Sequence, residues 1–293
     1  MTLAKTIAIV GSNGFIGKHL CQYFLGRSYK IRRFDSRFPF DLTKSQVLRD
    51  LEGIDIIIWA ASRVNPMIAE KSPEITLDEY QSWVDTLALL KLAKWDGKLI
   101  FLSSGGSVYD SGITPYKETD GASGSNAYGK LKSKMESELQ VSGLHYIVLR
   151  VANVYGPFQK LGRGQGVLAE WLNCFKNNAP LLVFGSENSY RDYINVLDVC
   201  RGIESVFNID FSDTFNLGSG VATSLGDLLK IFKDCAGKEI EVIEHASREY
   251  DRHGFFLDLR KFQMHTNWEP TVDLATGISR LLKTEKESNG LGA

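Results

Sequence analysis

The sequence has little cysteine, little proline and no long apolar run: four cysteines and seven prolines occur in 293 residues. The cysteines are too far apart to form a CxxC redox pair or a metal-binding clip, so we expect free, mostly buried thiols at Cys21, Cys174, Cys200 and Cys235. Such thiols are typical of a reducing cytosol, which predicts a cytoplasmic location. A membrane-spanning helix needs ~18 consecutive apolar residues, and because no segment approaches this length, no membrane span is predicted.

An excess of charge of either sign is also missing, since 34 Lys and Arg balance 35 Asp and Glu to a formal net charge of −1. This balance argues against a nucleic-acid binder that works through bulk positive charge, and no nucleic-acid partner is predicted. The five histidines form no HxxxH or HExxH pattern, so no metal site is predicted. Apolar residues make up 43% of the chain, which is enough for a globular core and excludes disorder as the overall state.

The first half of the chain alternates short apolar runs, typical of buried strands, with helical patterns. Strands are predicted at 6–10, 29–34, 54–60, 98–102 and 146–151, and helices at 16–25, 45–51, 77–93 and 125–141. Continuous apolar strands bounded by helices indicate a parallel sheet that is covered on both faces. Right-handed crossovers then give an α/β fold with a doubly wound parallel sheet of the Rossmann type.

From about Gly156 the alternation loosens. A glycine-rich loop (LGRGQG) precedes a predicted helix at 167–177, followed by strand-like segments at 181–184, 190–196 and 239–244 and by helices from Leu197 and Ser224. No linker separates this part from the first half. We therefore expect a first domain over residues 1–155, a smaller lobe over 156–283 that is interleaved with the sheet, and a flexible tail over 284–293.

Glycine is abundant, and three of the 27 glycines form a pattern directly after the first predicted strand, at Gly11, Gly14 and Gly17. Gly11 permits a sharp turn, Gly14 lets the backbone approach a pyrophosphate, and Gly17 lets the helix pack closely on the strand. The helix N-terminus supplies free N–H groups for phosphates. The alternative is a tight strand–helix turn without a ligand. The strand–turn–helix context favours a dinucleotide site, whose residues would also include Asn13, Phe15 and Ile16.

Asp35 ends the second predicted strand, 18 residues after Gly17. A carboxylate there can accept hydrogen bonds from both ribose hydroxyls of an adenosine, which favours NAD. Arginines at 32, 33 and 37 could instead hold a 2′-phosphate, so NADP stays open, and Asp35 could also be a plain turn residue. Asp41 and Leu42 are candidates for the adenine contact, although Asp41 could equally cap a helix.

Tyr128 and Lys132 lie four residues apart in a predicted helix, which puts them on one face. A nearby ammonium and a cationic nicotinamide favour the phenolate, so we expect a lowered pKa for Tyr128 and a role in moving the proton of a carbinol. The alternative is a surface pair. The segment 102–110 (LSSGGSVYD) follows a predicted strand, where open α/β sheets bind ligands, and its serines could hold the substrate oxygen beside Tyr128.

In combination these motifs resemble the extended short-chain dehydrogenases/reductases, and among them the NAD-dependent epimerase/dehydratase group that acts on nucleotide sugars. The resemblance runs from GSNGFIG at 11–17 to about residue 282. It implies that residues 1–155 form an NAD(P)-binding Rossmann domain and that 156–283 bind a nucleotide-sugar substrate. It also implies a homodimer formed through two helices of each subunit.

The resemblance carries further residues into the predicted site. WAAS at 59–62 resembles the segment that lines the cofactor, which adds Ala60, Ala61 and Ser62. RVANVYGP at 150–157 implies that Asn153 reaches the sugar or its phosphate, and RDYINVLD at 191–198 implies that Arg191 grips the diphosphate. Arg191 could instead form a structural ion pair with a neighbouring aspartate. By the loosest match, Arg248 and Asp251 would contact the substrate nucleotide.

Three departures from the family pattern bear on the chemistry. Gly105 stands where the family usually has its catalytic Ser or Thr, so Ser104 or Ser107 would have to substitute, and the choice between them is open. Asp110 replaces a glycine, and the short 35–41 interval lacks the usual helix, as in some reductases of 4-keto nucleotide sugars. Gly106 and Ser107 replace the Asp-Glu pair of the 4,6-dehydratases, which argues against dehydration.

Two enzyme functions remain, and both transfer hydride at C4 of a nucleotide-linked hexose. We expect a UDP-glucose 4-epimerase-like enzyme, because Asp35 favours NAD and an epimerase recycles its cofactor. The alternative is a 4-ketoreductase, for example of dTDP- or UDP-4-keto-6-deoxyhexoses, which the short second loop favours. A non-enzymatic dinucleotide sensor is disfavoured because Tyr128 and Lys132 are both present.

Overall fold

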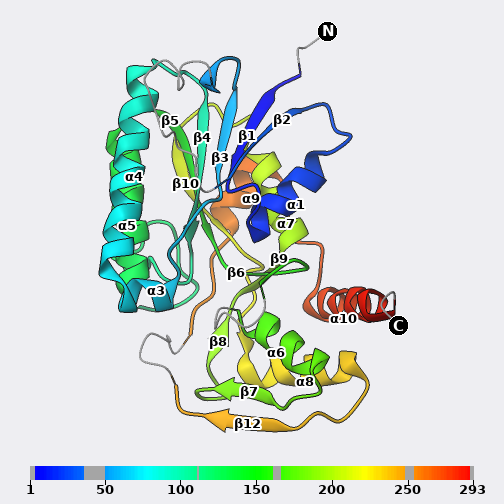
Figure 1. Ribbon diagram of the computed structural model, residues 1–293. Coiled ribbons are helices and arrows are strands. Elements are labelled where there is room, and N and C mark those ends of the chain that lie inside the picture. The colour runs from blue at the N-terminus through cyan, green and yellow to red at the C-terminus, as the bar shows by residue number, and fades with distance from the viewer. Residues whose placement is uncertain (1–3, 36–49, 111, 161–165, 248–253, 291–293) are drawn as a thin grey trace.

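The computed structural model describes residues 4–35, 50–110, 112–160, 166–247 and 254–290, with side chains omitted over 284–290. Its centre is a six-stranded parallel sheet in the order β10-β5-β4-β3-β1-β2 (Figure 1). This confirms the predicted fold class. The strands are β1 (Thr6–Val10), β2 (Lys30–Phe34), β3 (Ile56–Trp59), β4 (Lys98–Ser104), β5 (His145–Val151) and β10 (Asp213–Leu217).

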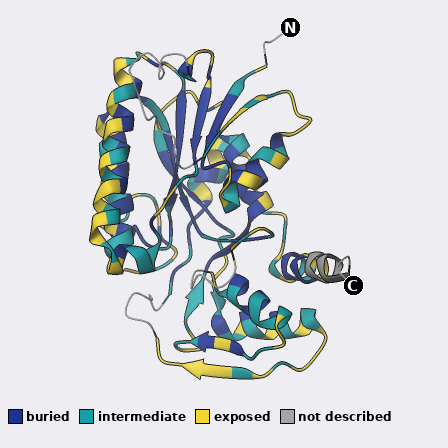
Figure 2. Cartoon of the chain, in the orientation of Figure 1, coloured by how far each residue is buried: buried dark blue, intermediate teal, exposed yellow. Residues whose placement is uncertain are grey.

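Helices cover both faces of this sheet, as its continuously apolar inner strands require. One face carries α3 (Pro66–Lys71), α4 (Pro73–Leu92) and α5 (Ala127–Val141), and the other carries α1 (Phe15–Phe24), α7 (Val196–Ser205) and α9 (Arg260–Thr266) (Figure 1). The strands between them are mostly buried, except for the edge strand β2, none of whose residues is buried (Figure 2). Two apolar cores result, one on each face.

Trp83 fixes α4 against both α5 and the sheet. Its indole is fully buried and packs edge-on against Trp59, with ring centroids 5.0 Å apart, and against Phe101 at 4.7 Å. Its Nε1 donates a hydrogen bond to the carbonyl oxygen of Met135 in α5 at 2.9 Å. The N-terminus of α5 is capped by Asn126, whose Oδ1 accepts from the N–H of Gly129 at 2.8 Å. The helix that carries Tyr128 and Lys132 is thereby fixed at its start and along its length.

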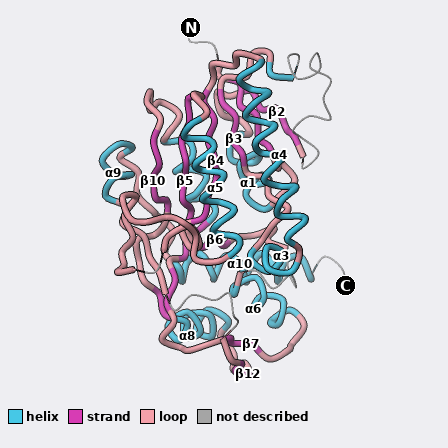
Figure 3. The backbone as a smooth tube through the Cα atoms, turned by 90° about the vertical axis from the view of Figure 1, so that its left-hand side faces the viewer, coloured by secondary structure: helices cyan, strands magenta, loops and turns pink. Residues whose placement is uncertain are grey.

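The smaller lobe lies below the carboxyl ends of the sheet strands and has its own core, centred on Trp171 and Phe232 (Figures 1 and 3). Its elements are α6 (Val167–Lys176), β7 (Leu181–Phe184), α8 (Leu225–Ala236), β12 (Val242–His245) and α10 (Leu274–Gly290). Two short pairs join the parts of the molecule: β6 (Asn153–Tyr155) with β9 (Tyr193–Asn195), and β8 (Tyr190–Arg191) with β11 (Thr223–Ser224). Because α7, β10 and α9 return to the main sheet, the lobe is threaded through the chain and not appended to it.

Most predicted elements occur within a few residues of their predicted bounds. The segment 190–196 forms two short strands, β8 and β9, because Asp192 between them turns inward, and the last strand begins at Val242. The predicted helix at 45–51 lies largely outside the described residues. Helix α10 continues to Gly290, into the stretch for which the sequence predicts a flexible tail. In the described part of the chain, no helix is long and apolar enough to cross a membrane. All four cysteines are free thiols, but only Cys200 is buried, so the expectation of mostly buried thiols is wrong for the other three, which are half-buried.

Candidate active site

A cavity of about 630 Å³ opens between the carboxyl ends of the sheet strands and the smaller lobe. In the sheet, β1 lies between β2 and β3, so the chain crosses to one side of β1 to form β2 and to the other side to form β3. This reversal is a topological switch point, where open α/β sheets bind ligands, and the cavity lies there. The cavity brings together residues that the sequence placed in six separate motifs. Those among its walls are Phe15, Ile16, Ala60, Ala61, Ser62, Ser104, Ser107, Tyr128, Lys132, Asn153 and Arg191.

The glycine turn joins β1 to α1 as the spacing predicts. Gly11 has a φ of +86°, and a Cβ there would lie 2.7 Å from the backbone nitrogen of Ala61, so only glycine is tolerated. Gly17 packs directly against the carbonyl of Gly11, which brings the start of α1 down onto the turn. Gly14 is the N-cap of α1 and has no side chain to occupy the helix end, while Asn13 beside it is exposed. The N-terminus of α1 is therefore open for an anionic group.

Asp35 lies at the edge of the same turn. The N–H groups of Gly11 and Ser12 both donate to the carbonyl oxygen of Phe34 at 2.9 Å, which holds the end of β2 against the glycines. Asp35, the next residue, is half-buried. Its predicted ribose contact stays a prediction. Asp41 and Leu42 lie outside the described residues.

Tyr128 and Lys132 lie on one face of α5 and both line the cavity. The Nζ of Lys132 is 5.8 Å from the centre of the Tyr128 ring and 4.9 Å from that of Phe101. Burial lowers the pKa of Lys132, and the negative charges of Glu79 and Glu136 oppose this. Burial, followed by the charge of Glu79, raises the pKa of Tyr128. The groups of the protein itself thus oppose the lowering of the tyrosine pKa that the sequence predicts, because desolvation and the charge of Glu79 both raise it.

Three serines at the end of β4 have different surroundings. The hydroxyl of Ser103 donates to Glu136 on α5. All three serines line the cavity, and among the described residues no protein group forms a hydrogen bond with the hydroxyl of Ser104 or Ser107. The carbonyl of Ser107 packs against Gly129, next to Tyr128, and accepts hydrogen bonds from the N–H of Ser125 at 2.9 Å and its hydroxyl at 3.1 Å.

The two glycines of this loop face other parts of the protein. A Cβ at Gly105 would lie 2.7 Å from a methyl group of Leu257, so a side chain at this position would point at Leu257. A Cβ at Gly106 would lie 2.8 Å from Cζ of Phe255, whose ring forms part of the cavity wall. The sequence did not single out Phe255, although two adjacent glycines in a strand-end loop are a signal of close packing.

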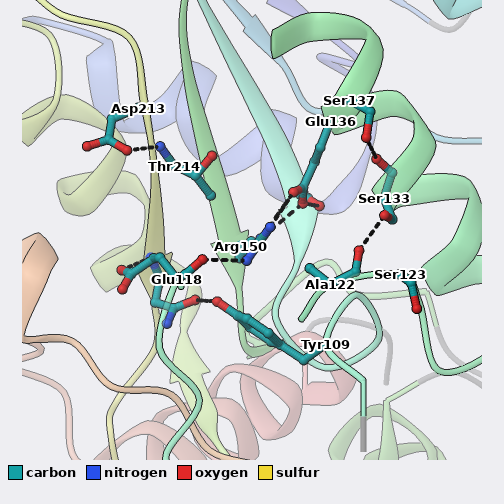
Figure 4. Close-up of polar contacts among 12 residues, drawn as sticks. Tyr109, Glu118, Ala122, Ser123, Ser133, Glu136, Ser137, Arg150, Asp213 and Thr214 are labelled. Carbon is teal, nitrogen blue, oxygen red and sulfur yellow. Dashed lines mark hydrogen bonds and ion pairs between the residues drawn. The ribbon is translucent and has the colours of Figure 1, made fainter. Parts of the chain in front are cut away.

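A buried polar network underlies this loop (Figure 4). Arg150 of β5 binds Glu136 of α5 with Nη2 at 2.8 Å and Nε at 3.1 Å from the same oxygen, and its guanidinium lies 4.8 Å from the ring centre of Tyr109. The hydroxyl of Tyr109 donates to Asn216 of β10 at 2.5 Å. This network joins three elements of the main domain beneath the cavity. Arg150 is therefore a structural residue, and it does not line the cavity.

Asn153 and Arg191 approach the cavity from β6 and β8. The guanidinium of Arg191 lies 5.9 Å from the ring centre of Phe255. Asp192 beside it is fully buried and accepts from the N–H and hydroxyl of Ser219, both at 2.7 Å, and from the N–H groups of Gly220 and Leu257. Asp192 thus holds the loop that carries Phe255. Asp198 accepts from Arg201, Thr271 and Val272. Arg248 and Asp251 lie outside the described residues.

A Rossmann sheet with an open glycine turn, and a cavity next to it that holds a half-buried tyrosine and a buried lysine, define a dinucleotide-dependent protein of the short-chain dehydrogenase type. Residues 7–218 match the NAD dependent epimerase/dehydratase family, and the chain belongs to this family.

Relatives of known name cover almost all of the chain. A dTDP-4-dehydro-6-deoxyglucose reductase of Escherichia coli is 28% identical, over 95% of this chain and 96% of its own length. A UDP-glucose 4-epimerase of Bacillus subtilis is 26% identical, over 90% of this chain and 91% of its own. The crystal structure of the Thermus thermophilus UDP-glucose 4-epimerase in complex with NAD superposes with a TM-score of 0.85. It covers 96% of this chain and 99% of the other at 22% identity, a likeness of fold.

Proposed function

We propose that this chain is an NAD(P)-dependent enzyme that transfers hydride at C4 of a nucleotide-linked hexose. The observation that carries the proposal is the cavity that is lined by Phe15 and Ile16, which follow the glycine turn, by Tyr128 and Lys132, and by Arg191. One end of it suits a dinucleotide, the middle holds an acid–base pair, and the other end holds a cation suited to a diphosphate. The family membership and the names of the relatives support the same chemistry.

The residues at the glycine turn fit a dinucleotide. The bare N-terminus of α1 at Gly14 can receive the pyrophosphate, and Asp35 at the end of β2 can hold the adenosine ribose, which favours NAD over NADP. Ala60, Ala61 and Ser62 line the cavity between the turn and Tyr128, so the nicotinamide would lie along them. The nicotinamide, when bound, supplies or accepts the hydride.

The chain's own residues would handle the proton and the orientation of the sugar. Tyr128 would give its hydroxyl proton to the C4 oxygen as a ketone is reduced, and would take that proton back as an alcohol is oxidised. Lys132 would stabilise the phenolate that results. Ser107, whose backbone packs beside Gly129, would hold the C4 oxygen with its hydroxyl, and we place it before Ser104 in this role. Arg191 would bind the diphosphate and Asn153 the sugar or its phosphate.

Between the two C4 reactions, we place 4-epimerisation first, because Asp35 suits a recycled NAD and UDP-glucose 4-epimerases stand among the relatives. Reduction of a 4-keto-6-deoxy sugar is the second candidate. It is favoured by the Escherichia coli relative and by the aromatic ring of Phe255 in the cavity wall, which suits an apolar sugar carbon. Dehydration is disfavoured because Gly106 carries no acid–base group and Phe255 occupies the space that a side chain there would need.

One experiment separates these activities. Purified protein is incubated with UDP-glucose without added cofactor, and separately with NADH or NADPH and a dTDP-4-keto-6-deoxyhexose, with Tyr128→Phe as the matched control. Formation of UDP-galactose supports the epimerase, and stoichiometric consumption of reduced cofactor supports the reductase. If neither substrate turns over, both C4 reactions are refuted for these substrates, and NADH binding by the wild type would then support the dinucleotide sensor.

The assembly and location of the protein are further expectations. We infer a homodimer through α4 and α5, whose outer faces carry the exposed apolar side chains Leu77, Leu92 and Val141. Size-exclusion chromatography with light scattering tests this, and Leu77→Lys with Leu92→Lys should yield a monomer. A cytoplasmic location is inferred from the free thiols and is tested by fractionation of the source cells.

A further inference from the structure

A buried carboxylate, that of Glu79 in α4, acts electrostatically on both Tyr128 and Lys132, and no sequence motif pointed to it. Its residue is 8% exposed. One oxygen accepts from the hydroxyl of Ser62 at 2.6 Å, and the other accepts from the N–H of Arg63 at 2.8 Å. Both donors follow β3, where Ser62 lines the cavity and Arg63 is the next residue. A buried charge is costly unless it is compensated, so a cation is expected nearby.

The packing of α4 on α5 places Glu79 opposite Lys132. These helices lie side by side and run in the same direction, because each connects neighbouring parallel strands (Figures 1 and 3). The hydrogen bond from Trp83 to Met135 fixes their register. Glu79 is one turn before Trp83, and Lys132 is one turn before Met135. The two charged side chains therefore occupy matching positions in the contact between the helices.

The other charged and titratable groups around Lys132 are engaged elsewhere or exposed. Glu136 on α5 is bound by Arg150 of β5 and by Ser103 of β4. Arg63 lies 3.7 Å from Glu79, but its side chain is 48% exposed and solvent weakens its charge. Tyr128 is neutral when protonated. Lys132 and Arg150 are thus two buried cations, and Glu79 and Glu136 are two buried carboxylates. Arg150 binds Glu136, so Glu79 is the carboxylate that remains to compensate the charge of Lys132.

We propose that Glu79 is a positioning residue for the catalytic pair, in which its carboxylate is the counterion of the Lys132 ammonium and also fixes the Ser62–Arg63 segment of the cavity wall. The role of Tyr128 and Lys132 in turnover rests on the proposed function, whereas the electrostatic interaction between Glu79 and Lys132 does not.

The charge of Glu79 acts on both members of the pair. Burial lowers the pKa of Lys132, and Glu79 is the largest influence that raises it again. After burial, Glu79 is also the group that raises the pKa of Tyr128. Both effects keep protons on the pair, so Tyr128 stays a proton donor, as reduction of a C4 ketone requires.

Glu79→Gln removes the negative charge and can keep hydrogen bonds to both Ser62 and Arg63. The new amide oxygen can accept from the N–H of Arg63, and its NH₂ group can donate to Ser62. The hydroxyl of Ser62 can then turn to the carbonyl of Val64, which is already 2.9 Å away. Asp85→Asn is the matched control, since it removes one negative charge from the exposed face of the same helix.

The first test needs no substrate. The protein is labelled with ¹³Cε-lysine, and the Lys132 resonance is assigned by its absence from Lys132→Gln and followed by NMR as pH rises. Lys132 should titrate at lower pH in Glu79→Gln than in the wild type, and at the wild-type pH in Asp85→Asn. Equal titration in all three proteins would overturn the proposal.

The second test is the pH profile of turnover with NADH and a dTDP-4-keto-6-deoxyhexose. The alkaline limb should move to lower pH in Glu79→Gln and stay in place in Asp85→Asn and in Glu79→Asp, which keeps the charge. A rate that falls equally at every pH in Glu79→Gln would assign Glu79 a structural role only and overturn the proposal. If the wild type converts UDP-glucose and not this ketone, the same profile is measured with UDP-glucose. If it converts neither substrate, the proposed function fails, and the NMR titration still decides the electrostatic interaction between Glu79 and Lys132.

Discussion

The ring of Phe255 fills the space into which a side chain at position 106 would project, since a Cβ on Gly106 would lie 2.8 Å from Cζ of that ring. Phe255 is itself held in place. Its N–H donates to the carbonyl of Tyr190 at 3.1 Å, and the N–H of Leu257 donates to Asp192. The Phe255 ring can therefore keep this position only if residue 106 has no side chain. An acid–base group at 106 is excluded by packing as well as by sequence.

Gly106→Asp should destabilise the protein and confer no dehydratase activity. Overpacking of this kind costs about 1–3 kcal/mol, measured as the free energy of unfolding in urea. Phe255→Ala in the same chain should recover part of this loss, because it vacates the space beside position 106. Equal stabilities of Gly106→Asp and the wild type would contradict the contact.

Tyr128→Phe should reduce kcat for the C4 reaction by at least about a hundredfold, because general acid–base catalysis contributes that much or more. NADH affinity, measured by fluorescence titration, should change little. Tyr80→Phe is the control, since Tyr80 donates to Glu138 on the outer side of the helices, 2.7 Å away. Unchanged turnover in Tyr128→Phe would refute the assignment of the proton donor.

Ser107→Ala should reduce kcat by about tenfold or more, since one hydrogen bond to the reacting oxygen is lost. Ser104→Ala is the paired variant, because both serines line the cavity. Its effect should be smaller, as the backbone of Ser107, and not that of Ser104, packs beside Gly129. Steady-state kinetics of the two variants decide the order, and a larger loss in Ser104→Ala would reverse the assignment.

Arg191→Ala should raise KM for the nucleotide sugar by about 10- to 100-fold, since a hydrogen bond to a charged group contributes about 1.5–3 kcal/mol. The Kd for NADH should stay within about twofold, because Arg191 lies at the other end of the cavity from the glycine turn. Arg27→Ala, which removes a surface arginine 3.6 Å from Glu204, is the control. A KM equal to that of the wild type would remove Arg191 from the substrate site.

Glu136→Gln should lower the free energy of unfolding by about 3–5 kcal/mol, because it leaves the buried guanidinium of Arg150 without its carboxylate. Replacing both residues by methionine should cost less than this single change, since no buried charge then remains unpaired. Urea denaturation of the three proteins makes the comparison. If the double variant is less stable than Glu136→Gln, the network (Figure 4) contributes more than charge compensation.

The sequence by itself determined the parts of this protein that depend on local spacing. The glycines at 11, 14 and 17 indicate a strand–helix turn because each satisfies a backbone requirement within one short segment, and Tyr128 and Lys132 share a helix face because they are one turn apart. Continuous apolar runs indicated the buried parallel strands, and most of the helix and strand bounds follow from the same periodicity.

Only the tertiary structure decided which distant residues meet. The charge of Glu79 acts on Lys132 across two helices whose register is set by the hydrogen bond of Trp83, and Phe255 faces Gly106 because the chain returns to the sheet from the smaller lobe. The direction in which the pKa of Tyr128 shifts likewise depends on burial. The four-residue spacing between Tyr128 and Lys132 gives no information about burial. These relations arise from packing between segments far apart in the chain, and no local pattern specifies them.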